Sequence, residues 1–155
     1  MTKIEKDVMI AEPVDKVYSF VKDWRNISQY LDYINEVKPI TEKTAEAGAR
    51  FALRLKFMGR MMNSEWEVVK EIDNKEWTIV AKLMGVRAVK LWRFSPTNGS
   101  TQVTFTLEYK LSPPVIGSLA DILWIRRQWD KIYERGLQNL KRQIEAKSDI
   151  AFHKA

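Results

Sequence analysis

The chain has 155 residues, of which 45% are hydrophobic and 11% aromatic, and it carries a formal net charge of +6 at pH 7. This length and composition suit one folded domain with its own hydrophobic core and argue against a disordered chain. The sequence contains no cysteine, and its one histidine, His153, lies close to the C-terminus. Thiol catalysis, disulfide bonding and Ser-His-Asp chemistry are therefore excluded, and neither a metal site nor a cofactor is expected.

Basic and acidic residues are mixed throughout the chain, without a long block of Lys or Arg. Such mixing is typical of a solvated surface, so nucleic acid is not an expected partner. The N-terminus lacks the charged and apolar regions of a signal peptide, and no apolar run reaches the ~20 residues of a membrane span. We therefore expect a cytoplasmic protein.

The N-terminal part predicts one strand followed by two short helices. Residues 3–10 form the expected first strand, which ends before Pro13, a residue type favoured in the first turn of a helix. Apolar residues then recur at helical spacing over residues 14–21 and again over residues 24–33, which predicts two short amphipathic helices. Residues 35–45 show a weaker strand pattern.

From residue 46 onward, apolar and polar residues alternate as they do in the strands of a half-covered sheet. One face collects aromatic and aliphatic side chains, whereas charged side chains gather on the other. We therefore expect the sheet to be covered on one side only. The apolar face includes Phe51, Leu53, Leu55, Phe57, Trp66, Val68, Trp77, Ile79, Trp92, Phe94, Val103, Phe105 and Leu107.

The connections between these strands are of two kinds, and the two kinds alternate. In an antiparallel meander, successive turns lie at opposite ends of the sheet, so one end is polar and the other is apolar. An apolar rim at one end indicates that an apolar molecule or surface docks there. The polar connections are residues 46–48, 73–75 and 96–99, and the apolar ones are residues 57–62, 83–87 and 111–116.

An apolar stripe from Pro114 to Lys147 predicts one long amphipathic helix that covers the apolar face of the sheet. At ~1.5 Å per residue this helix is roughly 45–50 Å long. Residues 148–155 are expected to form a flexible tail. Gly136 lies on the stripe, where glycine costs about 1 kcal/mol relative to alanine. Two explanations for it remain open: close packing of the helix, or room for a ligand beneath it.

This order of elements resembles the START/SRPBCC superfamily and, within it, the polyketide cyclase/dehydrase and lipid-transport group. The resemblance implies one α+β domain, residues 1–147, with the helix-grip fold. In this fold a curved antiparallel sheet of about seven strands wraps around the long C-terminal helix, and two short helices follow the first strand. The motifs that carry the resemblance are residues 10–21, Trp24 with Tyr30, residues 48–51, Trp66, Trp92-Arg93-Phe94 and residues 99–105.

The resemblance also implies a cavity between the sheet and the long helix, because members of the superfamily bind sterols, phospholipids, polyketides or other hydrophobic molecules there. We therefore predict that the chain binds or transports a hydrophobic or anionic amphiphilic small molecule. The predicted cavity lining is Tyr33, Phe51, Leu53, Leu55, Trp66, Val68, Trp92, Phe105, Leu107, Trp129, Tyr133 and Gly136. The predicted cavity mouth is Met58, Arg60, Met62, Met84, Arg87 and Pro114.

The predicted mouth combines methionines, whose flexible side chains suit ligands of varied shape, with two arginines. Arg60 and Arg87 take similar places in two apolar hairpins, where they are expected to hold the carboxylate or phosphate of the ligand. The same rim also fits packing against the long helix, dimerisation, or peripheral contact of a lipid carrier with a membrane. Monomer and homodimer both remain open.

An enzymatic alternative rests on Tyr33, which stands where aromatase/cyclases of the superfamily place a tyrosine in the pocket. Those cyclases also carry a serine and an arginine where this chain has Val68 and Lys70, so the resemblance favours a binding protein over a polyketide cyclase. For a reaction, the candidates are Tyr33 as proton donor and either Lys70 or Lys90 as the cation that stabilises an enolate. The preferred interpretation of both lysines is that they lie near strand ends and reach solvent.

Overall fold

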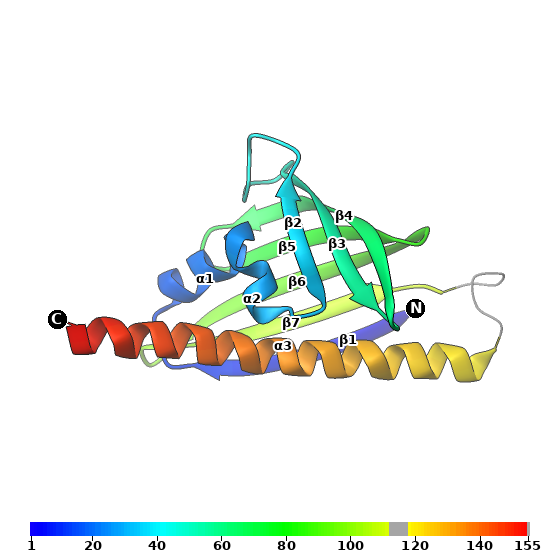
Figure 1. The fold of residues 1–155 in the computed structure, drawn as a ribbon. Helices are drawn as coiled ribbons and strands as arrows, with labels where there is room; N and C mark the ends of the chain where they lie inside the picture. Colours follow the sequence, from blue (N-terminus) through cyan, green and yellow to red (C-terminus); the bar gives the residue numbers. More distant parts are fainter. Residues whose placement is uncertain (112–117, 155) are drawn as a thin grey trace.

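Seven antiparallel strands form one sheet that curves around the long C-terminal helix (Figure 1). The computed structural model describes residues 1–111 and 118–154. Strands β2 to β7 follow one another as a meander, and β1 pairs with β7 at the far edge, so the predicted α+β helix-grip fold is confirmed. The strands are β1 (Thr2–Ile10), β2 (Ile34–Pro39), β3 (Arg50–Phe57), β4 (Arg60–Ile72), β5 (Glu76–Leu83), β6 (Val86–Thr97) and β7 (Ser100–Tyr109).

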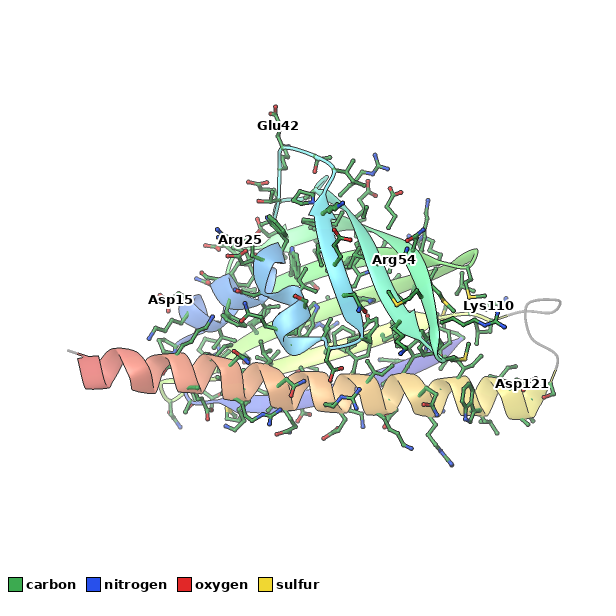
Figure 2. The ribbon with its side chains drawn as sticks, in the orientation of Figure 1. Asp15, Arg25, Glu42, Arg54, Lys110 and Asp121 are labelled. Carbon is green, nitrogen blue, oxygen red and sulfur yellow. The ribbon has the colours of Figure 1, made fainter. Side chains whose placement is uncertain are left out.

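The alternation in β3 shows how these residues build a one-sided sheet. Phe51 and Leu55 are buried on the inner face, whereas Arg54 is exposed on the outer face. Charged side chains such as Arg54 and Glu42 project from the outer surface of the molecule (Figure 2). Because adjacent side chains in a strand point to opposite faces, each strand gives one apolar face to the core and one polar face to solvent.

Two short helical segments follow β1, as predicted. Helix α1 (Val14–Lys22) begins directly after Pro13. The second segment is shorter than expected: a 3₁₀ turn, η1 (Trp24–Asn26), leads into the single turn α2 (Ile27–Tyr30). Tyr33 therefore lies in the connection between α2 and β2, with its side chain buried.

The long helix α3 (Leu119–Lys154) runs alongside β1 (Figure 1). Ser118 caps its first turn, because the Ser118 hydroxyl accepts a hydrogen bond from the Asp121 amide at 3.2 Å. The predicted start at Pro114 falls outside the described residues. At the other end the helix continues to Lys154, beyond the predicted end at Lys147, and the flexible tail over residues 148–155 stays a prediction.

Polar contacts hold α3 against the edge strand β1. The Lys6 ammonium lies 3.0 Å from the Asp130 carboxylate and 3.3 Å from that of Glu134. Further along the helix, Lys141 Nζ donates a hydrogen bond to the Met9 carbonyl oxygen at 2.8 Å. These contacts link several turns of α3 to β1 and so fix the helix across the open side of the curved sheet.

Gly136 marks a close approach between α3 and α2. A Cβ atom at this position would lie 2.8 Å from Leu31 Cδ2 and 3.4 Å from the Tyr30 carbonyl oxygen. Asn139 Nδ2 donates a hydrogen bond to the same carbonyl at 3.4 Å. Close packing therefore explains Gly136, and the prediction that this glycine leaves room for a ligand is wrong.

Candidate functional site

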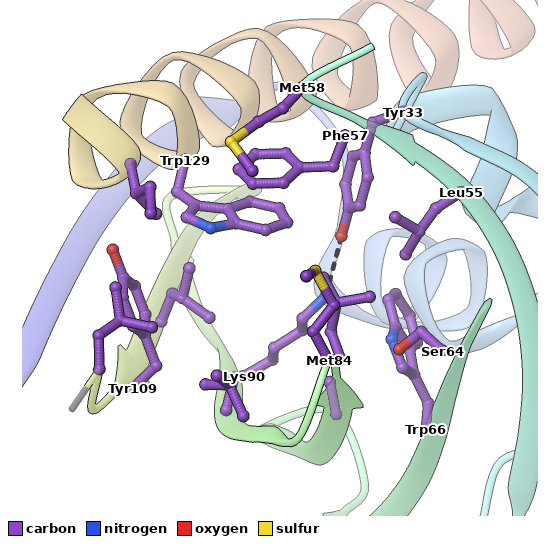
Figure 3. Close-up of a pocket in the computed structure, with 17 residues that line it drawn as sticks. Tyr33, Leu55, Phe57, Met58, Ser64, Trp66, Met84, Lys90, Tyr109 and Trp129 are labelled. Atoms are coloured by element: carbon purple, nitrogen blue, oxygen red, sulfur yellow. Dashed lines mark hydrogen bonds between the residues drawn. The ribbon is translucent and has the colours of Figure 1, made fainter. Parts of the chain in front are cut away.

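An apolar cavity of about 150 Å³ lies between the sheet and α3, at the end of the sheet that carries the apolar turns (Figure 3). Trp129 and Ile125 of α3 form one side of it. Inner-face residues of the sheet, including Leu55, Trp66 and Leu107, form the other side. The cavity is thus enclosed by the same apolar faces that build the core, at a place where they do not meet.

Two alanines keep this part of the sheet hollow. Ala81 on β5 and Ala88 on β6 are direct partners in the sheet, and both border the cavity. Small side chains at paired inner positions leave a gap that larger residues would fill. Neither alanine was among the predicted site residues, although the alternation of the strand places Ala81 on the same face as Trp77 and Ile79.

The other half of the sheet, nearer the polar turns, is filled by side chains from the short helices. Tyr30 of α2 packs edge-to-face on Trp92, with ring centroids 5.8 Å apart. Tyr18 of α1 packs in the same way on Phe94, at 5.2 Å. Because α1 and α2 cover only this half, the cavity is confined to the half that they leave uncovered.

The predicted cavity lining therefore separates into two groups. Alternation identifies the inner face of a strand, but it does not tell how far along the strand the cavity extends. The predicted residues that border the cavity are Tyr33, Leu55, Trp66, Leu107 and Trp129. The other predicted lining residues do not border the cavity and are buried in the packed core, so the prediction is wrong for them: Phe51, Leu53, Val68, Trp92, Phe105, Tyr133 and Gly136.

Lys90 of β6 borders the cavity and is buried, with only 5% of its surface exposed. Its Nζ atom donates a hydrogen bond to the Tyr33 hydroxyl at 2.9 Å and lies 4.0 Å from the centroid of the Trp66 ring. Burial lowers the pKa of Lys90 well below the usual value of a lysine. The interpretation that Lys90 reaches solvent is wrong, because its side chain points inward from the body of the strand.

Two buried tyrosines complete a lysine–tyrosine cluster, which consists of Lys90, Tyr33 and Tyr133. The two tyrosine hydroxyls are 2.8 Å apart and share a hydrogen bond. Burial raises the pKa of both hydroxyls, so both stay protonated at neutral pH. The Lys90 amine lies 5.6 Å and 5.5 Å from the centroids of the Tyr33 and Tyr133 rings, within reach of their π faces.

Lys70, the other candidate lysine, points away from the cavity. The pairing of β4 with β5 passes from Val68↔Ile79 directly to Lys70↔Thr78, so Val69 is an extra residue in a β-bulge. The bulge reverses the alternation and turns Lys70 to the outer face. There its ammonium pairs with Glu76 at 2.7 Å, which removes Lys70 as a catalytic candidate.

The two arginines of the predicted mouth do not form a matched pair. The residues that flank the two-residue turn are Phe57 and Arg60 in the first hairpin, but Leu83 and Val86 in the second. Arg87 lies one position further along its strand than Arg60, which turns it to the opposite face of the sheet. Neither arginine borders the cavity, so the prediction of a paired arginine clamp is wrong.

The methionines of the predicted mouth are placed differently from one another. Met58 and Met84 border the cavity at the tips of the two hairpins and are 45% and 63% exposed. Met62 packs against the core and does not border the cavity. Pro114 lies outside the described residues, so its predicted place at the mouth stays a prediction.

Within residues 1–111 and 118–147, acidic side chains do not come together in a group that could hold a metal ion. The helices of the same part of the chain are not apolar enough over a sufficient length to cross a membrane.

A family model described as "Polyketide cyclase / dehydrase and lipid transport" matches residues 1–145. The chain belongs to this family. No curated protein sequence matches the chain. Because the family description spans both enzymes and lipid carriers, the residues of the cavity must decide what this member does.

Solved structures similar to this chain share its fold over nearly the whole length. TTHA0849 from Thermus thermophilus is 22% identical, with a TM-score of 0.76, and the match covers 95% of this chain and 99% of that one. A START superfamily protein from Mycobacterium smegmatis is 15% identical, with a TM-score of 0.77 and coverage of 93% and 97%. The di-domain ARO/CYC BexL from the BE-7585A biosynthetic pathway is 20% identical, with a TM-score of 0.73; the match covers 94% of this chain and 47% of BexL.

Proposed function

We propose that the chain binds a small hydrophobic molecule that carries one oxygen-containing polar group. The observation that carries this proposal is an apolar cavity with the Lys90 amine and the Tyr33 hydroxyl among its lining groups. A hollow core and a buried amine both cost stability, since a filled apolar core would be more favourable. A ligand that fills the space and meets the amine offsets both costs.

The volume of the cavity favours a compact ligand. Dry apolar cavities of roughly 150 Å³ hold a benzene-sized molecule, whereas pockets for drug-sized ligands span roughly 300–1,000 Å³. The 150 Å³ of this cavity therefore suits one or two rings or a short acyl chain. A longer molecule is expected to extend past Met58 and Met84 into solvent.

The polar group of the ligand is expected beside the lysine–tyrosine cluster and not at the opening. Lys90 and Tyr33 supply hydrogen-bonding groups inside the cavity, whereas Met58 and Met84 give the opening an apolar edge. A carbonyl, hydroxyl or carboxylate oxygen can accept a hydrogen bond from the amine. A carboxylate would in addition favour the charged form of Lys90, as an opposite charge nearby does.

Filling the cavity tests this function. We expect Ala88→Leu to weaken binding of the neutral two-ring fluorescent probe 2-naphthol at least tenfold, because the added isopropyl group occupies the space beside Ala81. Val89→Leu is the matched control, since it enlarges the next residue of β6 on the outer face. Equal probe affinity in wild type and Ala88→Leu would contradict the proposal. If Ala88→Leu weakens binding as expected, native mass spectrometry of protein purified from its own host would identify the natural ligand.

Delivery of the ligand at a membrane surface is a second candidate, favoured by exposed apolar residues near the opening. Trp124, early in α3, is 49% exposed and directly precedes Ile125, which borders the cavity. The exposed Arg126 and Arg127 follow on the same helix and can attract anionic lipids.

Flotation with liposomes that contain phosphatidylserine tests this second candidate. Binding is expected to weaken as the salt concentration rises and in Trp124→Ser. The control is Met9→Ser, which removes an exposed apolar side chain from β1. Liposome binding that Trp124→Ser leaves unchanged would contradict membrane delivery and leave ligand binding untouched.

A further inference from the structure

Lys90 occupies a position where packing alone would favour an apolar residue. Its neighbours on the inner face of β6 are Ala88 and Trp92, and its partners on the adjacent strands are Ile79 and Leu107. A lysine at this point must bring its amine into apolar surroundings, which is unfavourable. We therefore infer that the amine has a role that a hydrocarbon side chain could not perform.

The groups that face the amine carry no negative charge. The titratable side chains that face it are Tyr33 from the α2–β2 connection and Tyr133 from α3, and Tyr109 of β7 borders the same cavity. Among the described residues, no carboxylate forms an ion pair with Lys90 or raises its pKa, which burial alone lowers. A neutral amine has a free electron pair, and a desolvated lysine of this kind is an activated nucleophile.

The amine is also accessible to a bound molecule. Lys90 borders the cavity, and the close-up shows its amine extending toward Tyr33 beneath Trp129 and Phe57 (Figure 3). A ligand in the cavity would therefore meet the nitrogen and the Tyr33 hydroxyl side by side, 2.9 Å apart.

We propose that Lys90 forms a reversible imine with the carbonyl group of a small hydrophobic aldehyde or ketone held in this cavity. The inference rests on the proposed binding function and names the chemical class of the ligand. The cavity volume restricts that class to aromatic or short aliphatic carbonyl compounds.

The bond changes balance without any further reactant. The Lys90 nitrogen attacks the carbonyl carbon, a C–N bond forms as the C=O π bond breaks, and the oxygen takes a proton from Tyr33 while the nitrogen returns one to it. This gives a carbinolamine. The C–O bond then breaks as the nitrogen electron pair forms the C=N π bond, the oxygen leaves as water with a second proton from Tyr33, and the nitrogen again returns a proton to Tyr33. The net products are one imine and one water molecule, and Tyr33 is unchanged.

Each tyrosine has a distinct part in this scheme. Tyr33 touches the reacting atoms, because its hydroxyl is hydrogen-bonded to Lys90 Nζ. Tyr133 is a positioning residue: its hydroxyl, 2.8 Å from that of Tyr33, can donate a hydrogen bond when Tyr33 has released its proton. The raised pKa of Tyr33 keeps it protonated between the two transfers.

Reductive trapping tests the proposal. The full-length protein is incubated with 2-naphthaldehyde and sodium cyanoborohydride, and the adduct is located by peptide mass mapping. We expect one predominant adduct, on Lys90, whose formation saturates with aldehyde concentration and is suppressed by the unreactive analogue 2-naphthalenemethanol. At neutral pH, Lys90 should react at least tenfold faster than exposed lysines such as Lys56 and Lys82, because the cavity holds the aldehyde beside the Lys90 amine.

Three variants sharpen the test. Lys90→Met should lose the adduct with no gain at other lysines, and Tyr33→Phe should slow its formation several-fold. Lys82→Arg, on the outer face of β5, should leave labelling of Lys90 unchanged. In wild type, binding of 2-naphthalenemethanol without preferential labelling of Lys90 would overturn the imine and leave the binding function standing. Failure of the alcohol to bind at all would overturn the binding function, and the imine with it.

Discussion

The two ends of the sheet use the same backbone turn with different residues. At the polar end, Asn98-Gly99 has positive φ angles of 50° and 81°. At the cavity end, Met58-Gly59 has 55° and 77°, and Met84-Gly85 has 51° and 76°. Hairpin turns of this kind favour Asn-Gly, and most side chains cost about 1–2 kcal/mol in the left-handed region. Turn geometry thus accounts for asparagine but not for methionine, whose explanation is the apolar surface that it supplies beside the cavity.

The two halves of the sheet also differ in how they are filled. Along the inner face of β6, Ala88 borders the cavity, whereas Trp92 and Phe94 pack against the short helices. Lys90 stands between them, at the boundary of the hollow and the packed half. We infer that the packed half supplies stability and that the hollow half, which lacks that packing, supplies the candidate site.

The largest expected effect compares a tryptophan from each half. Trp77 is fully buried near the polar turns, and its indole nitrogen donates a hydrogen bond to the Ala45 carbonyl at 3.0 Å. We expect Trp77→Ala to lower the free energy of unfolding by about 3–5 kcal/mol, measured by urea denaturation, with unchanged probe affinity of the folded fraction. Trp129 is half-buried and stacks on Phe57, with ring centroids 4.3 Å apart. Trp129→Ala should lower the free energy of unfolding by only about 1–2 kcal/mol, because less of its surface is buried.

Probe titration of the same two variants should rank their effects in the opposite order. Trp129→Ala removes a wall of the cavity and should weaken probe binding at least tenfold, which is about 1.4 kcal/mol. If Trp77→Ala weakened binding as much as Trp129→Ala, the division of the sheet into a stabilising half and a binding half would be wrong.

The second effect concerns Lys90, at the boundary between the hollow half and the packed half of the sheet. We expect Lys90→Met to raise the free energy of unfolding by about 1–3 kcal/mol at neutral pH, because it replaces a desolvated amine by an apolar side chain. The gain should shrink as pH rises. Since burial lowers the pKa of Lys90, the unfolded chain binds more protons than the folded one up to about pH 10, so wild-type stability increases with pH by up to about 1.4 kcal/mol per unit.

Urea denaturation of wild type and Lys90→Met at several pH values between about 6 and about 9 checks this slope, because groups common to both proteins cancel in the difference. The tyrosines that face Lys90 do not interfere, since burial raises the pKa values of Tyr33 and Tyr133 and unfolded tyrosines ionise only near pH 10. A difference in stability that stays constant with pH would show that Lys90 keeps its proton.

The smallest effect tests the turns themselves. Met84→Asn should stabilise the protein by up to about 1 kcal/mol, because asparagine tolerates the left-handed conformation better. It should also weaken probe binding two- to fivefold by making the opening polar. Asn98→Met is the mirror variant, expected to destabilise by a similar amount and to leave binding unchanged. Thermal denaturation and probe titration of both variants measure these effects. A loss of stability in Met84→Asn would show that the left-handed conformation of Met84 does not cost stability.

Much of the fold could be predicted because it depends on patterns that local sequence displays. Alternation and turn residues located β3 to β7, and the apolar stripe located α3. The sequence could not show the bulge at Val69, which turns Lys70 outward, because a bulge depends on the register between two strands. The offset of Arg60 from Arg87 was missed for the same reason: it becomes visible only when each turn is placed within its pairing.

The sequence by itself determined the family resemblance, the inner and outer faces of the strands and the contrast between polar and apolar turns, since each follows from the order of residues along one segment. Only the tertiary structure decided which half of the inner face is hollow, because that depends on where α1, α2 and α3 meet the sheet. It likewise decided that Gly136 serves close packing and that Lys90 is buried beside Tyr33. The environment of a buried amine is made by residues far apart in the chain, and no local pattern records it.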